Sequence, residues 1–188
     1  MRNLATFFII LFAYFQLSGQ ELKIQEPEYL GNIIFVTDSS NFIKLEKQKV
    51  GSKAKANAAA YVPYAGLVAG KVKGMNTIQG AKSSVRIEKK SNLNFIIKVS
   101  DNRIEPFELF NIFKLEQNVK KDYRFLEVAS TSTFGGSSSM EIAYIPFSAK
   151  KYGESSFIIE IQEELAPGEY AITIEGSRDI FNLFGINE

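Results

Sequence analysis

The 188-residue chain carries 22 basic and 21 acidic side chains, and 45% of its residues are hydrophobic, which is typical of a globular protein. A formal net charge of +1 gives it no polyelectrolyte character, so we expect no nucleic-acid partner. Cysteine and histidine are both absent, which excludes disulfides, thiolate or imidazole metal sites, a cysteine-linked lipid anchor and histidine-dependent nucleophiles.

The first residues have the layout of a secretory signal peptide. Arg2 precedes an apolar run over 4–17, and the small residues Ser18 and Gly19 follow that run, which is short for a transmembrane span. We predict a signal peptide over 1–19, a linker over 20–27 and a secreted or periplasmic bacterial protein that is not a lipoprotein. An uncleaved N-terminal anchor is the alternative, because Leu17 lies where a small residue is usual.

Beyond residue 28 the chain alternates short β-prone runs with turn-forming clusters. The runs cover 29–36, 42–45, 84–88, 95–99, 108–115, 123–129, 140–147, 157–161 and 170–174. Their spacing, without a convincing amphipathic helix, predicts an all-β fold: a single antiparallel β-sandwich of about eight or more strands over 28–188. A closed barrel is the alternative architecture.

Some connections between these runs are also predictable. Asn92 and Asn94 lie at a bend, which indicates a hairpin between 84–88 and 95–99. The run 108–115 is apolar on both faces, which favours a central strand. The Gly- and Ser-rich stretch 130–139 predicts a flexible loop, with Phe134 pinning it to the surface.

The last two runs carry the clearest local signal. Both alternate apolar and polar residues, and Pro167-Gly168 between them favours a tight turn, so we expect the runs to pair. The stretch Leu165-Ala-Pro-Gly-Glu-Tyr170 resembles the tyrosine corner of immunoglobulin-like and fibronectin-type sandwiches. The resemblance implies an immunoglobulin-like fold in which the Tyr170 hydroxyl ties the entering loop to the strand; it implies no particular activity.

The region 51–80 is unusual in composition and is predicted to be a Lys-, Gly- and Ala-rich insertion. Gly66, Gly70 and Gly74 are spaced four residues apart, which on a helix permits close approach of two backbones. Pro63 and the shortness of the uncharged run argue against a transmembrane helix. Two interpretations remain open: a Gly/Ala loop or short helix lying on the sandwich, or a segment that inserts into a membrane surface or a partner's groove.

Charge is segregated along the chain although its total is small. From Lys44 to Lys90 there are eleven basic residues against two acidic ones, and from Glu154 to Glu188 eight acidic residues against Arg178. Either the two stretches neutralise each other in the fold, or the basic stretch forms a patch for an anionic surface such as phospholipid, lipopolysaccharide or acidic glycan. The candidate contacts of such a patch are Lys47, Lys49, Lys53, Lys55, Lys71 and Lys73.

Carboxylates are the remaining candidates for catalysis. Glu160, Glu163 and Glu164 cluster in one run and its turn, as the paired acids of a hydrolase would, but they lie where solvated residues are usual. We therefore predict no enzyme, no metal and no cofactor, and a non-catalytic binding or structural module of the cell envelope or extracellular space. The alternatives are a membrane-associating or self-assembling protein that acts through 56–74, and a small carboxylate-dependent hydrolase. The partner classes left open are an envelope glycan, a lipid surface and another protein.

Overall fold

The computed structural model describes residues 24–56, 71–132, 136–139, 141–177 and 179–188. These residues form two mainly antiparallel β-sheets, one helical turn, α2 (Pro106–Leu109), and a short 3₁₀ turn, η2 (Val119–Lys121). The predicted all-β, sandwich-like fold is confirmed at this level. The predicted signal peptide lies outside the described residues.

The first sheet has five strands in the order β11-β12-β7-β1-β2, and every pair is antiparallel. Its strands are β1 (Ile33–Val36), β2 (Phe42–Lys44), β7 (Leu93–Lys98), β11 (Ser148–Tyr152) and β12 (Ser156–Ile161). Asp38 fixes the turn between β1 and β2, because its carboxylate accepts from the backbone N–H groups of Ser40 and Asn41, both at 2.9 Å.

The second sheet is longer and follows the order β3-β14-β13-β8-β9-β5-β4. Its path comprises β3 (Glu46–Lys49), β4 (Gly51–Ala56), β5 (Lys71–Gln79), β8 (Phe110–Asn118), β9 (Tyr123–Ser132), β13 (Gly168–Ile174) and β14 (Ile180–Ile186). In addition, β10 (Gly136–Ser139) pairs with β9, and β6 (Arg86–Ile87) lies parallel to β14.

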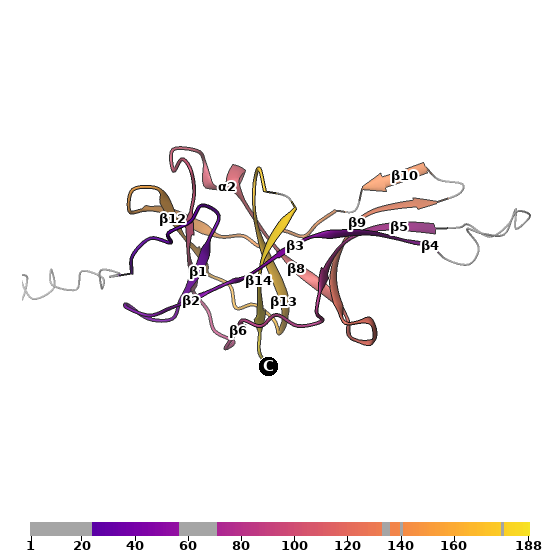
Figure 1. Ribbon diagram of the computed structural model, residues 1–188, viewed down its shortest axis with the longest axis horizontal. Coiled ribbons are helices and arrows are strands. Elements are labelled where there is room, and N and C mark those ends of the chain that lie inside the picture. The colour runs from indigo at the N-terminus through magenta and orange to yellow at the C-terminus, as the bar shows by residue number, and fades with distance from the viewer. Residues whose placement is uncertain (1–23, 57–70, 133–135, 140, 178) are drawn as a thin grey trace, which may run out of the picture.

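This second sheet curls back on itself. β3 and β4 lie at opposite ends of the strand order, yet only Val50 separates them in the chain, so the two ends of the sheet meet there. The distal parts of β4, β5 and β9, together with β10, extend beyond the body as an arm on the right of Figure 1. We call the curled part, which encloses its own core, the barrel.

Two apolar cores follow from this arrangement, because successive residues of a strand point to opposite faces. Ile112, Ile172 and Phe184 point from the barrel toward the first sheet, where they meet residues such as Phe95 and Ile159. Inside the barrel a second core contains Ile78, Phe113, Leu115, Ala171, Phe181 and Leu183. β8 lies between β13 and β9 in the strand order, which agrees with the prediction of a central strand. Its pairing with β9 is limited to Glu116–Asn118, beyond the predicted run 108–115, and residues 108–109 belong to α2.

The predicted pairing of the last two alternating runs is wrong. β12 belongs to the first sheet and β13 to the second, so the turn at Pro167-Gly168 crosses between layers instead of closing a hairpin. Ile161 and Tyr170 both face the core between the sheets. The alternation of apolar and polar residues in the two strands is therefore as compatible with two facing sheets as with a hairpin. The hairpin predicted around Asn92 is wrong for the same reason, because β6 pairs with β14 and β7 with β1 and β12.

Three loop and strand predictions also change. The residues 51–56 and 71–79, expected in a loop or helix, form the paired strands β4 and β5, while 57–70 lies outside the described residues. The expected strand over 140–147 makes only an isolated bridge between Tyr144 and Phe113. The expected loop over 130–139 is a β9–β10 pairing in its described part, and Phe134 lies outside that part.

The hydrogen bond expected of the tyrosine corner is confirmed. The Tyr170 hydroxyl donates to the carbonyl oxygen of Ala166 at 2.6 Å, and its ring stacks on Phe184 with 5.5 Å between ring centroids. Burial raises the pKa of Tyr170, and the nearby Glu163 carboxylate raises it further, so the phenol stays protonated as a donor. In the described part of the chain no helix has the length and apolar character needed to span a bilayer.

Candidate functional site

One end of the barrel is closed by the segment 80–87, which lies across it and is held by buried charges. Arg124 of β9 and Glu169 of β13 point into the barrel and expose 0% and 1% of their surface. The guanidinium of Arg124 lies 2.8 Å from Glu46 Oε1 and 3.5 Å from Glu169 Oε2, and it donates to the carbonyl oxygens of Gly80 and Gln79. The buried charges of Arg124 and Glu169 therefore both have partners inside the protein.

The closing segment completes the same network. Ser83 donates its backbone N–H to Glu169 at 2.7 Å and its hydroxyl to Glu46 at 2.7 Å. Arg86 pairs with the second oxygen of Glu169 and donates to Asn187 Oδ1 at 2.9 Å. A side chain at Gly185 would overlap the Arg86 guanidinium, so glycine there makes room for the pair. Two arginines and two glutamates balance, which indicates a structural network.

Among the residues of this network, Glu46 has a pKa that is clearly shifted by its surroundings. Burial raises its pKa, but hydrogen bonds from Ser83 and Arg124 and from the Ser84 backbone outweigh burial and lower that pKa to about 2. Glu46 is therefore ionised at neutral pH and serves as a fixed acceptor rather than as a proton carrier.

A second charged region lies on the outside of the barrel, and we call it the lysine hollow. It is a cavity of ≈ 540 Å³ whose lining includes Lys49 of β3, Lys53 of β4 and Lys121 of η2. Its other lining residues are mostly polar, and Tyr123 supplies an aromatic ring on which the Lys53 ammonium lies, 4.7 Å from the ring centroid. The three lysines are exposed and form no ion pair within the described chain.

The turn between β8 and β9 positions Lys121. The Asn118 side chain caps η2 by accepting from the Lys121 backbone N–H at 3.1 Å, and Asp122 follows in the left-handed conformation with φ 49°. The Asp122 carboxylate, the acidic group lining the hollow, accepts from the Ala81 N–H at 2.8 Å and is thus tied to the closing segment. The lysines consequently dominate the charge of the hollow.

The structure separates the lysines grouped by the sequence analysis. Lys49 and Lys53 line the hollow, and Lys55 follows on the exposed strand β4. Lys73 pairs with Glu127 at 2.8 Å, which raises the pKa of Lys73, and Lys47 donates to the carbonyl oxygen of Gly31 at 3.1 Å. Lys71 belongs to β5, but its side chain is outside the described set.

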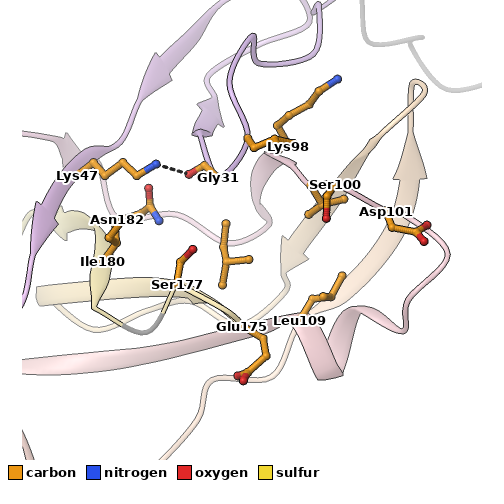
Figure 2. A pocket seen from close by; sticks show the side chains of 13 residues that line it. Gly31, Lys47, Lys98, Ser100, Asp101, Leu109, Glu175, Ser177, Ile180 and Asn182 are labelled. Carbon is orange, nitrogen blue, oxygen red and sulfur yellow. Dashed lines mark hydrogen bonds between the residues drawn. The ribbon is translucent and has the colours of Figure 1, made fainter.

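Lys47 lines a different cavity, of ≈ 300 Å³, where the two layers separate between the end of β7 and the start of β14 (Figure 2). Figure 2 shows its side chain reaching toward Gly31. Lys98, the other lysine of this lining, pairs with Glu26. Both ammonium groups already have acceptors, so this cavity is a weaker candidate for an anionic ligand.

The other predicted site residues have structural surroundings. Gly74 lies on β5 at a β-bulge next to Ala129, whereas Gly66 and Gly70 lie outside the described residues. Leu165, Pro167, Gly168 and Tyr170 form the corner between the layers, where Leu165 is buried and Gly168 has φ +153°.

Glu160 and Glu164, two of the carboxylates considered for hydrolysis, line neither the lysine hollow, nor the cavity of Figure 2, nor a further cavity of ≈ 440 Å³. Glu160 lies on β12, and Glu164 makes an exposed pair with Lys89 at 2.8 Å. Asp101 does line the cavity of Figure 2, but its carboxylate pairs with Arg103 at 2.9 Å, and the hydrogen bond from the Arg103 guanidinium lowers the pKa of Asp101 to about 2. The described residues contain no group of three or more acidic side chains arranged to hold a metal ion.

Sequence reasoning missed Lys121, Tyr123 and the buried partners of Arg124. Lys121 stands in a Lys-Lys-Asp turn whose polarity indicated only a solvated connection, and nothing local shows that this turn meets β3 and β4. Arg124 alternates with apolar Phe125 and Leu126 in a strand, where a lone arginine ordinarily indicates a solvent-facing position.

No family model matches the chain, and no curated protein or solved structure shows significant similarity to it.

Proposed function

We propose that this chain is an exported, non-catalytic binding module that uses the lysine hollow to hold an acidic glycan. The observation that carries the proposal is the convergence of Lys49, Lys53 and Lys121 from three separate elements on one cavity. Three ammonium groups that form no ion pair with the described residues, gathered in one concave site, attract a carboxylate, sulfate or phosphate more strongly than dispersed surface lysines do.

The shape of the hollow favours a glycan over a membrane surface. A flat bilayer cannot enter a concave site, and the lining offers polar groups and Tyr123 instead of the large apolar side chains that insert into lipid. Tyr123 presents an amphipathic ring, and the exposed amide of Gln79 supplies a donor and an acceptor suited to sugar hydroxyls.

Two further proposals complete this assignment. The layout of residues 1–19 supports export through a signal peptide, which N-terminal sequencing of the mature protein tests: a mature chain that begins at Gln20 supports it. The Tyr170–Ala166 hydrogen bond supports an immunoglobulin-like relationship for the corner between the layers.

Binding of immobilised dextran sulfate and of neutral dextran tests the glycan proposal. The wild-type protein should bind the sulfated polymer, release it as salt rises, and ignore the neutral one. The triple variant Lys49→Gln, Lys53→Gln, Lys121→Gln should bind about tenfold or more weakly, since each lysine near an anionic partner contributes about 1 kcal/mol.

A matched control removes the same charge elsewhere. Lys44, Lys150 and Lys151 are exposed lysines on strands β2 and β11 of the first sheet, and their triple exchange to Gln should leave binding unchanged. Equal losses in both triple variants would overturn the hollow as the site. Stronger binding to phosphatidylglycerol vesicles than to dextran sulfate would replace the glycan by a lipid surface.

A further inference from the structure

The open end of the barrel, opposite the segment 80–87, contains a cavity of a different kind. The register places Asn111 opposite Thr173, Phe113 opposite Ala171 and Leu115 opposite Glu169 on β8 and β13. Because opposite residues point to the same face, the interior passes from the charged closed end through an apolar middle to Asn111 and Thr173 at the other end.

This end stays open because β8 and β9 separate. They pair only over Glu116–Asn118 and Tyr123–Phe125, close to their connecting turn. Farther along, Tyr144 bridges to Phe113 and Ile145 donates its N–H to the Ile112 carbonyl oxygen at 2.8 Å. The residues around Ile142 and Tyr144 thus lie along β8, and a cavity of ≈ 440 Å³ remains inside the barrel mouth.

The walls of this cavity are aromatic and aliphatic. Phe113 makes edge-on contacts with Phe181 at 5.3 Å and with Tyr144 at 6.4 Å between ring centroids. Leu126, Val128 and Ile142 supply aliphatic walls. A volume of this size lined by such groups suits a small molecule with an apolar body, and barrel mouths are common sites for such ligands.

Polar groups at the mouth restrict the chemistry of that molecule. The side chains of Asn76, Asn111 and Thr173 line the cavity, and none of them makes a hydrogen bond within the described chain. Amide and hydroxyl groups both donate and accept, so they match a neutral amide, amine or hydroxyl. The described lining contains no lysine or arginine, so no basic side chain there would compensate the charge of an anion.

We propose that the barrel mouth binds a small neutral molecule with an aromatic or compact aliphatic body and one hydrogen-bonding polar group. This site is independent of the lysine hollow, whose ligand is anionic, so either one can fail without the other. Binding occurs between preformed strands, with apolar contact from Phe113 and Phe181 and polar recognition by Asn111.

The neutral fluorescent amine N-phenyl-1-naphthylamine is a suitable probe, because its emission rises in an apolar site. It should bind the mature protein saturably at one site. 8-Anilino-1-naphthalenesulfonate has the same rings and an added sulfonate, and it should displace the neutral probe about tenfold or more weakly. The readout is the amount of neutral probe that stays bound after free ligand is removed, because the sulfonate also fluoresces when bound and its emission from the lysine hollow would otherwise contribute.

Variants locate the site. Val128 is half-buried in the cavity wall, so Val128→Phe fills the cavity and should lower the affinity for the neutral probe about tenfold or more. Ile43 lies on exposed β2, and Ile43→Phe should leave that affinity unchanged. Asn76→Phe gives a second test if Val128→Phe lowers the unfolding midpoint. Asn111→Leu removes the polar partner of the probe's amine and should lower the affinity for the probe about fivefold to tenfold.

No saturable binding of the neutral probe to folded wild type would overturn the proposal. So would wild-type affinity for the neutral probe in both Val128→Phe and Asn76→Phe, or a sulfonate that competes for the site with the same affinity as the neutral probe.

Discussion

The closed end of the barrel and the lysine hollow both contain several charged side chains, but these side chains differ in burial and in ion pairing. At the closed end Arg124 and Glu169 are buried and each has charged partners. In the hollow three exposed ammonium groups have no ion pair in the described chain. The charges of the closed end are enclosed and matched, as expected of charges that stabilise a fold, whereas those of the hollow are exposed in a concave site, as the proposed binding role requires.

This contrast also relates to the two explanations of the segregated sequence charge. Arg86 pairs with Glu169 and Lys89 with Glu164, so part of the basic stretch is neutralised by the acidic one. Lys49, Lys53 and Lys121 are not neutralised in this way and remain available. The chain therefore contains both intramolecular complementarity and a local basic site.

The largest effect should come from breaking the buried network. Glu169→Ala leaves the Arg124 guanidinium buried with one acidic partner fewer and should lower the free energy of unfolding by about 3–5 kcal/mol in urea titrations. Glu164→Ala breaks an exposed pair and should change it by about 0.5 kcal/mol or less. Similar losses in both variants would mean that the closed end is not the stabilising element described here.

Removing the Glu46 charge should have a smaller, pH-dependent effect. The folded pKa of about 2 lies below the ordinary value of 4.5, so the folded state binds fewer protons and ionised Glu46 stabilises it above that ordinary value. This contribution should be lost as the pH falls from about 4.5 to about 2.

Urea unfolding of wild type and Glu46→Gln between neutral and acidic pH checks this expectation. At neutral pH the variant should lose about 1.5–3 kcal/mol, since hydrogen bonds to a charged acceptor are replaced by weaker ones. Wild type and variant should converge as the pH falls. Parallel pH curves would show that Glu46 does not contribute the pH dependence.

Tyr170→Phe should cost about 1 kcal/mol, because it removes the hydrogen bond to Ala166 but keeps the ring stacked on Phe184. Thermal unfolding measures the change. Tyr29→Phe, at a 62% exposed position, is the matched control and should leave the midpoint where it is in wild type. A silent Tyr170→Phe would mean that the corner does not fasten the two layers.

The smallest effect on stability should belong to the hollow. The triple exchange of Lys49, Lys53 and Lys121 to Gln should shift the free energy of unfolding by only about 0.5 kcal/mol, because these lysines are exposed and without ion pairs in the described chain. Its large effect should appear in glycan binding alone. A strong loss of stability would place these lysines with the structural charges of the closed end.

The sequence was informative where a signal is local. Alternation in 157–161 and 170–174 identified both strands, the two-faced apolar run over 108–115 identified a central strand, and Leu165 to Tyr170 identified the corner hydrogen bond. The sequence misled where partners had to be chosen. Alternation shows that a strand has one buried face, but it does not say which sheet covers that face.

By itself, the sequence determined that this chain builds layers of β-strands and that its corner is tied by Tyr170, because periodicity and hydrogen bonding between near neighbours depend on local chemistry. Only the tertiary structure decided that β3 and β4 close the second sheet at Val50, that Arg124 meets Glu46 and Glu169, and that Lys121 joins Lys49 and Lys53. These residues are far apart along the chain, and their meeting depends on long-range strand order, which short patterns do not encode.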